Sequence, residues 1–307
     1  MKRTLKDYLI IFFKGIAMGA ADVVPGVSGG TIAFISGIYE ELLKTINSFN
    51  LEAIRTLRKK GVKAAWKTIN GNFLIALLAG IGTSILSLAQ LIKWLLENKP
   101  ILLWSFFFGL VFASIFYIAK HIKKWNLLTI LMLLTGGFLA YYITILPPMS
   151  NSISSGWFMF FAGALAICAM ILPGISGSFI LLLLGAYKPV LDALHDKDFK
   201  TLFFLIGGAI IGLLSFSRLL KWLFDKYHNV TLAVLTGFVA GSLNKIWPWK
   251  KVLESEMING KLKILREESI SPFSYDGNSQ LTYAIVLAII GFLVIVLLEK
   301  SAKVKVL

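Results

Sequence analysis

Long apolar runs alternate with short polar stretches along almost the whole chain. Several runs approach or exceed the ~20 apolar residues that a helix needs to cross a bilayer. The runs that look long enough to span lie at about residues 73–96, 101–119, 127–147, 201–224, 230–247 and 281–298. This pattern predicts an all-α integral membrane protein with one membrane domain and no separate soluble domain.

Two further apolar regions, about 8–46 and 157–194, are each interrupted near the middle by a Pro-Gly-x-Ser-Gly element. Each arm beside the interruption has about 15 to 17 residues, which is short for a full crossing. Non-helical backbone at membrane depth is tolerated only where protein or a water-filled cavity surrounds it. We therefore expect two re-entrant helical hairpins, although two full crossings would give the same loop assignments.

The same order of features occurs twice, which indicates an internal duplication. Residues 14–46 and 162–194 align at an offset of 148 residues, and the spans that follow align at an offset of 128. The offsets differ because a basic insert at about 51–70 occurs only in the first copy. We divide the chain into repeat one, residues 1–148, and repeat two, residues 149–307, each with one hairpin and three spans.

The distribution of basic residues predicts the orientation. The chain carries 31 Lys and Arg against 16 Asp and Glu, a net charge of +15. The two termini and segments 44–67, 120–126 and 218–226 are basic and fall on one predicted side, which should be cytoplasmic. Cytoplasmic loops of membrane proteins carry an excess of Lys and Arg, so the positive net charge does not require a nucleic-acid partner. Three spans per repeat is an odd number, so repeat two should be inverted, as in many secondary transporters.

The two broken elements are the candidate binding site. Proline ends the first arm, glycine permits close approach, and the next arm begins with free N–H groups at a positive helix end, which suits an anion such as phosphate. In an alternative, purely structural interpretation, the glycines allow close helix packing and the prolines only kink the helices. The candidate substrate-binding residues are Pro25, Gly26, Val27, Ser28, Gly29, Gly30 and Thr31 in the first copy and Pro173, Gly174, Ile175, Ser176, Gly177 and Ser178 in the second.

Two charged residues join this list. Asp22 precedes the first break, and its counterpart in repeat two is Met170. A carboxylate in an apolar segment is a functional hypothesis by default, so Asp22 is the candidate for coupling transport to protons, unless it is an interfacial helix-end residue. Arg218 lies near the end of span 201–224, where it could bind phosphate or snorkel to the cytoplasmic surface. The single cysteine and three histidines predict no disulfide, metal or cofactor.

The first Pro-Gly-x-Ser-Gly element also suggests the hypothesis that the protein is an enzyme. Gly26-Val27-Ser28-Gly29-Gly30 fits the G-x-S-x-G pattern of serine hydrolases, which requires a base beside the serine. All three histidines fall in predicted connecting loops, and Ser178 replaces the final glycine in the second copy. We therefore expect a protein that is not an enzyme. A small-anion transporter or channel is the nearer alternative, because chloride-channel proteins also use glycine-serine-proline breaks in inverted repeats.

The segments GAADVVPGVSGGTIAFISGIYEEL and ILPGISGSFILLLLGAY, with their spacing, resemble the bacterial polyprenyl-phosphate translocase family PopT over essentially the whole chain. This resemblance implies a lipid transporter of the bacterial cytoplasmic (inner) membrane. It implies that undecaprenyl phosphate is flipped from the outer to the cytoplasmic leaflet, so that the carrier is reused in cell-wall and surface-polymer synthesis. The residues alone fit a phosphate head group, do not identify the isoprenoid tail, and leave a homo-oligomer open.

Overall fold

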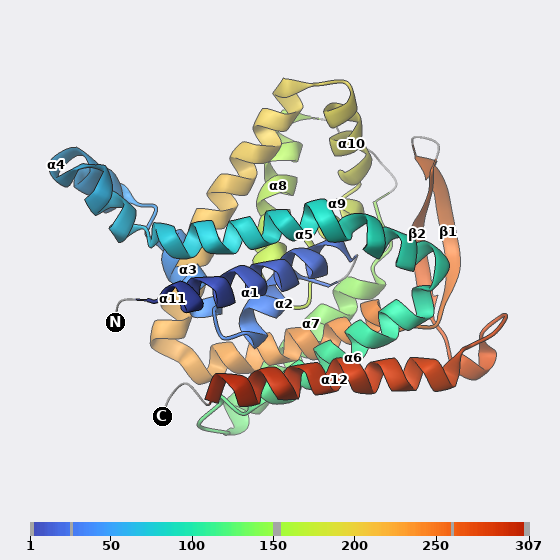
Figure 1. The fold of residues 1–307 in the computed structure, drawn as a ribbon. Coiled ribbons are helices and arrows are strands. Elements are labelled where there is room, and N and C mark those ends of the chain that lie inside the picture. The colour runs from blue at the N-terminus through green and yellow to red at the C-terminus, as the bar shows by residue number, and fades with distance from the viewer. Residues whose placement is uncertain (1–2, 25–26, 150–154, 259–260, 304–307) are drawn as a thin grey trace.

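The computed structural model describes residues 3–24, 27–149, 155–258 and 261–303. Over these residues the regular secondary structure is α-helical apart from short 3₁₀ turns and one antiparallel strand pair (Figure 1). The helices of the first half are α1 (Leu5–Val23), α2 (Gly29–Ile35), α3 (Tyr39–Asn47), α4 (Leu51–Thr68), α5 (Gly71–Asn98), α6 (Pro100–Ala119) and α7 (Leu127–Ile145). Those of the second half are α8 (Gly156–Ile171), α9 (Gly177–Leu183), α10 (Tyr187–His195), α11 (Phe199–Ser242) and α12 (Leu281–Lys303), with the 3₁₀ turns η1 (Leu243–Ile246) and η2 (Pro272–Ser274). The strands are β1 (Lys250–Ile258) and β2 (Lys261–Ser269).

Apolar helices with exposed apolar faces identify an integral membrane protein. Four helical stretches are long and apolar enough to cross a bilayer, namely α5, α6, α7 and the run from Phe199 to Ile246, and the bent pair of α9 and α10 could add a fifth. Their outer faces expose large side chains, such as Leu86 at 86% and Phe138 at 67%. Soluble proteins rarely expose contiguous apolar surface of this kind, whereas a bilayer covers it. The predicted spans 73–96, 101–119 and 127–147 coincide with α5, α6 and α7.

The next two predicted spans, 201–224 and 230–247, form one long element. Helix α11 contains both and is interrupted at Tyr227, whose φ of −129° and ψ of 44° are not helical. In the first half, α5 and α6 meet at Lys99, which has a similar φ of −139° and ψ of 48°. These two residues correspond at the offset of 128, so the same backbone turn joins the same two helices in each half. The last predicted span, 281–298, lies in α12, whose described apolar stretch is Leu281–Leu297.

Each predicted hairpin contains a second break that the sequence analysis did not predict. We expected one uninterrupted arm after each Pro-Gly element, but a turn at Gly37 divides the first into α2 and α3, and a turn at Gly185 divides the second into α9 and α10. Both glycines have positive φ, 73° and 68°. The following residue donates its N–H to a carbonyl five residues earlier, which is the Schellman arrangement that ends a helix. The second turn bends the chain by 106°.

Glycines let neighbouring helices approach closely, and they do so at corresponding places. A Cβ at Gly80 of α5 would overlap the carbonyl of Phe12 in α1. A Cβ at Gly208 of α11 would overlap the carbonyl of Phe160 in α8. Small residues at such contacts are what membrane helices use for tight packing. Helix α1 therefore packs on α5 as α8 packs on the first part of α11, which Figure 1 shows as two neighbouring pairs.

The last helix of each half packs on the other half. Helix α12 lies along α6, where a Cβ at Gly109 would overlap the carbonyl of Ala288. Helix α7 lies along the second part of α11, where a Cβ at Gly237 would overlap the carbonyl of Leu133. The two halves are therefore interlocked, because each supplies a helix to the packing of the other.

Two segments lie outside this helical core. The predicted basic insert, about 51–70, is the exposed helix α4, which projects from the body of the molecule (Figure 1) and kinks at Gly61. The strands β1 and β2 are a departure from the predicted all-α class. Asn259-Gly260, which lies outside the described residues, separates two runs of β-prone sequence, and Asn-Gly is a strong hairpin signal that the sequence analysis overlooked.

Candidate functional site

The first broken element begins where α1 ends at Val23 and continues into α2. Ser28 caps α2, because its Oγ accepts a hydrogen bond from the N–H of Gly30 at 3.1 Å. The carboxylate of Asp22 reaches back and accepts the N–H of Gly29 at 2.7 Å. The first free N–H groups of α2 are therefore already bound by side chains of the same hairpin. Pro25 and Gly26, which were nominated with them, lie outside the described residues.

The two broken elements are in direct contact, although 148 residues separate them. We call α1–α3 hairpin one and α8–α10 hairpin two. Ser28 Oγ donates to the carbonyl of Met170 at 3.0 Å, and Tyr39 Oη donates to the carbonyl of Ile171 at 3.1 Å. The last carbonyls of a helix have no partner within that helix, so these hydroxyls satisfy the end of α8.

A third hydrogen bond crosses between the hairpins in the opposite direction. The N–H of Gly174 donates to Thr31 Oγ1 at 2.9 Å, and both groups are buried. Close packing adds to this contact, since a Cβ at Gly30 would lie 2.7 Å from the carbonyl oxygen of Ile171. The structure thus brings together the residues that the sequence nominated in each copy, by main-chain as well as side-chain groups.

Burial differs between the two copies. Residues 27–31 of the first copy are all buried, and Ser28 and Thr31 are each only 1% exposed. Residues 173–176 of the second copy are buried too, but Gly177 is half-buried and Ser178 is exposed. The hydroxyls of Ser176 and Ser178 lie 2.7 Å apart. The second element is therefore open to its surroundings at Ser178, whereas the first is covered.

Arg218 and the histidines lie apart from the contact between the two hairpins. Arg218 is exposed on α11, and among the described residues no hydrogen bond or ion pair joins it to either hairpin. No described histidine bonds to Ser28: His228 lies 3.4 Å from the Glu40 carboxylate, and His121 lies 2.8 Å from the Tyr117 carbonyl. Ser28 thus has carbonyls and a backbone N–H as partners rather than a base. Within the described residues, no group of His, Cys, Asp and Glu could hold a metal ion.

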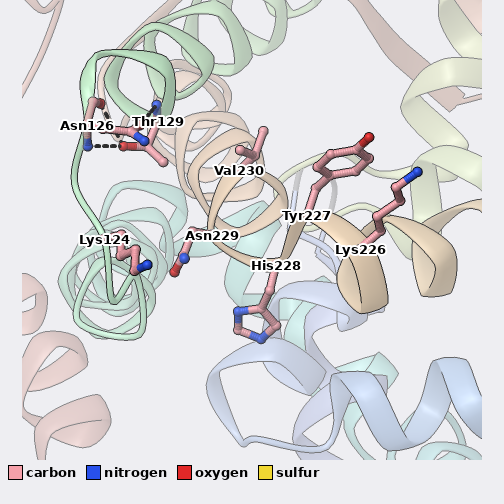
Figure 2. Close-up of a pocket in the computed structure, with 8 residues that line it drawn as sticks. All are labelled: Lys124, Asn126, Thr129, Lys226, Tyr227, His228, Asn229 and Val230. Carbon is pink, nitrogen blue, oxygen red and sulfur yellow. Dashed lines mark hydrogen bonds between the residues drawn. The ribbon is translucent and has the colours of Figure 1, made fainter.

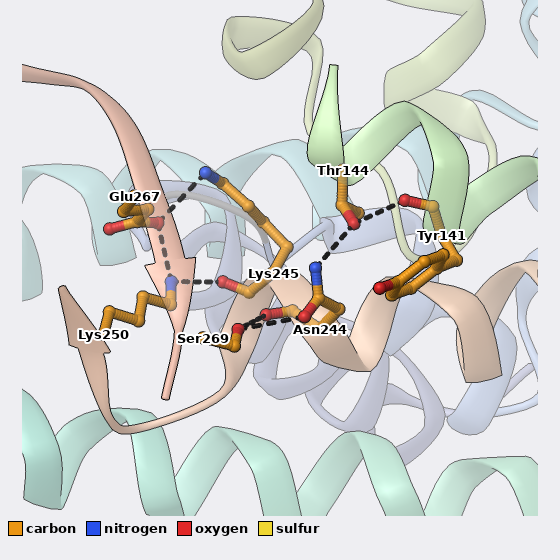
Figure 3. Close-up of polar contacts among 7 residues, drawn as sticks. All are labelled: Tyr141, Thr144, Asn244, Lys245, Lys250, Glu267 and Ser269. Atoms are coloured by element: carbon orange, nitrogen blue, oxygen red, sulfur yellow. Dashed lines mark hydrogen bonds and ion pairs between the residues drawn. The ribbon is translucent and has the colours of Figure 1, made fainter. Parts of the chain in front are cut away.

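An ionic network beside hairpin two was missed by the sequence analysis. Lys245 in η1 and Lys250 in β1 both contact Glu267 Oε1 in β2, at 3.0 and 2.7 Å (Figure 3). Lys250 lies in β1, beyond the end of the span Phe199–Ile246, and burial lowers its pKa to about 8 despite the nearby carboxylate of Glu267. The Lys245 ammonium lies 4.6 Å from the centre of the Phe179 ring in α9. Only a weak signal for this network is present in the sequence, since Lys245 stands at the end of an apolar run.

A shallow pocket of about 170 Å³ occupies a different place, at the turn within α11 (Figure 2). It contains none of the nominated residues. Its lining comes from the linker before α7, the start of α7 and the α11 turn, and consists of Lys124, Asn126, Thr129, Lys226, Tyr227, His228, Asn229 and Val230. Asn229 Oδ1 accepts the N–H of Lys123 at 2.9 Å, which ties the linker to this turn.

Comparisons with known proteins point in one direction. The profile of a family described as VCA0040-like, undecaprenyl phosphate translocase-like, matches residues 18–263. A Vibrio cholerae serotype O1 protein named polyprenyl-phosphate transporter is 46% identical over 302 residues, which are 97% of this chain and 98% of that protein. A Staphylococcus aureus protein of the same name is 31% identical over 258 residues, 78% of this chain and 86% of that protein. No solved structure matches the chain.

Proposed function

Because this chain belongs to the undecaprenyl phosphate translocase-like family, we propose that it carries a polyprenyl phosphate across the bacterial cytoplasmic membrane. The observation that carries the proposal is the 46% identity, over 97% of the chain, to a protein named polyprenyl-phosphate transporter. The proposed substrate is undecaprenyl phosphate, moved from the outer to the cytoplasmic leaflet so that the carrier is reused. The names of both relatives also favour transport over catalysis.

The proposed phosphate site lies between the two broken elements. Its polar groups are the hydroxyls of Ser28, Thr31, Ser176 and Ser178, and the glycines allow the phosphate to approach the backbone. In the described arrangement Ser28 and Thr31 bond to hairpin two, so the hairpins must separate before their hydroxyls can bind a ligand. Ser178 is already exposed. We therefore place the first contact of the phosphate at hairpin two and its release at hairpin one.

Inverted repeats are the proposed basis of alternating access. Repeat one, residues 1–148, and repeat two, residues 149–307, share the order of their helices and the glycine contacts between α1 and α5 and between α8 and α11. With both termini in the cytoplasm, hairpin one opens to the cytoplasm and hairpin two to the outside. Two halves of opposite orientation can expose one site to each face in turn.

Asp22 is the proposed coupling residue. Its carboxylate accepts the N–H of Gly29, so it occupies a position where a phosphate oxygen would otherwise bind. A carboxylate and a phosphate repel each other at such a distance, and protonation of Asp22 would remove that repulsion. Asp22→Asn keeps an acceptor oxygen for Gly29 and removes the charge. We expect this variant to fold normally and to lose the proton dependence of transport, whereas full proton-dependent transport would remove Asp22 from the mechanism.

The function is tested by measuring undecaprenyl phosphate movement in liposomes that contain the purified protein. The wild type is compared with Ser28→Ala/Ser176→Ala and with Ser87→Ala/Ser215→Ala. The second pair is a matched control, because Ser87 and Ser215 are exposed, correspond at the offset of 128, and among the described residues bond only to carbonyls of their own helices. Movement that the first variant loses and the control keeps would support the paired site. Chloride or phosphate flux without lipid movement would favour a small-anion transporter instead.

A further inference from the structure

The network of Lys245, Lys250 and Glu267 holds more positive than negative charge. Two ammonium groups contact a single carboxylate oxygen, at 3.0 and 2.7 Å (Figure 3). The side chains are only 18%, 10% and 19% exposed in that order. Taking charges out of water is costly unless they are paired. A second cation here requires an explanation, because the described residues supply a single carboxylate for both ammonium groups.

Lys250 alone is enough to anchor the strands. Its ammonium makes the shorter contact with Glu267, donates to the carbonyl of Lys245 at 2.5 Å and lies 4.6 Å from the centre of the Trp104 ring in α6. These contacts tie β1, β2 and η1 to the helical core. The carboxylate of Glu267 would stay paired if the ammonium of Lys245 moved away. Lys245 is therefore the surplus cation of the network.

The surplus cation lies beside the open part of hairpin two. The Lys245 ammonium is 4.6 Å from the ring centre of Phe179, the residue after the exposed Ser178. On the other side of the turn, a Cβ at Gly174 would lie 2.6 Å from Ser242 Oγ, three residues before Lys245. The segment that carries Lys245 thus packs against Gly174 within the second Pro-Gly-x-Ser-Gly element and against Phe179, two residues after it.

We infer that Lys245 binds the phosphate group of the lipid at hairpin two, together with the hydroxyls of Ser176 and Ser178. This inference rests on the proposed function. A lysine binds phosphate as a point charge, and a phosphate monoester carries about −1.5 to −2 charges at pH 7. When Lys245 turns from Glu267 to the phosphate, Lys250 keeps the carboxylate neutralised, so no buried charge is left alone. Lys250 and Glu267 are positioning residues in this arrangement.

The test compares binding of a short-chain polyprenyl phosphate with binding of the polyprenol of the same length, which lacks the phosphate. Full-length protein in detergent is used as wild type, Lys245→Gln, Lys245→Arg and Lys251→Gln. Lys251 is the matched control, because it is an exposed lysine of β1, one residue after Lys250. We expect Lys245→Gln to bind the phosphate roughly tenfold more weakly, the effect of one charged hydrogen bond, and to bind the polyprenol unchanged. Lys245→Arg and Lys251→Gln should stay close to wild type.

Three results would overturn the inference in distinguishable ways. If wild type prefers the phosphate and Lys245→Gln keeps that preference, Lys245 does not contact the phosphate. If Lys245→Gln weakens binding of both lipids and lowers the unfolding temperature, its role is structural. If wild type binds phosphate and polyprenol equally, the proposed function fails and the inference with it.

Discussion

Replacing Thr31 with valine removes one hydrogen bond from the junction between the two hairpins. Valine has nearly the shape of threonine but cannot accept the N–H of Gly174, which Thr31 Oγ1 accepts at 2.9 Å. Both groups are buried, so water cannot take the place of the lost acceptor. The substitution therefore leaves a backbone donor without a partner at the centre of the proposed site.

The expected loss of stability depends on whether the N–H of Gly174 finds another hydrogen-bond acceptor in the variant. Hydrogen bonds between membrane helices contribute about 0.6 kcal/mol on average, because the separated groups find other partners. A buried N–H that finds none costs about 1–3 kcal/mol. Thr31→Val should reach this higher range. Tyr39→Phe should cost less, because it frees only the carbonyl of Ile171, and a carbonyl tolerates incomplete bonding better than an N–H does.

Thermal unfolding of the purified variants in one detergent measures this order. Thr135→Val is the control, since Thr135 is exposed on α7 and its one hydrogen bond within the described part of the chain goes to the carbonyl of Leu131 in its own helix. We expect Thr31→Val to lower the unfolding temperature most, Tyr39→Phe to lower it less, and Thr135→Val to leave it nearly unchanged. Equal unfolding temperatures for Thr31→Val and Thr135→Val would refute the argument that this hydrogen bond joins the hairpins.

Two further predictions concern packing and charge. Gly80→Ala should destabilise the protein by about 1–3 kcal/mol, because the new methyl meets the Phe12 backbone, whereas Gly82→Ala, with nothing within 4 Å, should be nearly neutral in the same unfolding assay. The lowered pKa of Lys250 predicts a change in Trp104 fluorescence centred near pH 8 rather than 10.5, seen as the difference between wild type and Trp104→Phe. In the unfolded chain Lys250 keeps its proton up to about pH 10.5, whereas in the folded protein it loses the proton near pH 8. The free energy of unfolding should therefore rise between these two pH values. A fluorescence difference that does not change with pH would contradict the lowered pKa of Lys250.

The apolar pattern predicted most of the helices because a bilayer imposes a length on each span. The predicted spans 73–96, 101–119 and 127–147 each fall within two or three residues of a helix in the structure. The predicted boundary between spans 201–224 and 230–247 coincides with the turn at Tyr227, where the two helical parts of α11 meet. The charged residues around Tyr227 lower the local hydropathy and so predict a boundary between spans there. Hydropathy does not predict the backbone conformation at that boundary.

Contacts between distant parts of the chain could not be predicted from periodicity. The repeat placed Ser28 and Ser176 at equivalent positions, which suggested one shared site, yet each serine has different partners. The proposed role of Lys245 depends on β1 and β2, because their pairing places Glu267 beside it, and the apolar pattern does not predict these strands. Asp22 was nominated for its charge alone, and only the fold shows that it caps α2.

The interlocked third helices limit how the two hairpins can separate. Helix α7 belongs to repeat one but packs on the second part of α11, and α12 belongs to repeat two but packs on α6. A rigid movement of one repeat against the other would break both interfaces, and each is tight enough that a glycine Cβ would overlap a carbonyl. Lys99 and Tyr227 interrupt the helices between these interfaces and the hairpins, with nearly the same dihedral angles.

We therefore expect the pairs α1–α5 and α8–α11 to move about these two turns while α6–α12 stays fixed. Spin labels on the exposed positions Phe112 of α6 and Ile289 of α12 should keep their distance when polyprenyl phosphate is added. The distance between labels at Leu86 of α5 and Phe161 of α8, also exposed, should change, because α5 packs on α1 of hairpin one and α8 belongs to hairpin two. If the first distance changes and the second does not, the repeats move as units, and the turns at Lys99 and Tyr227 are fixed parts of the scaffold.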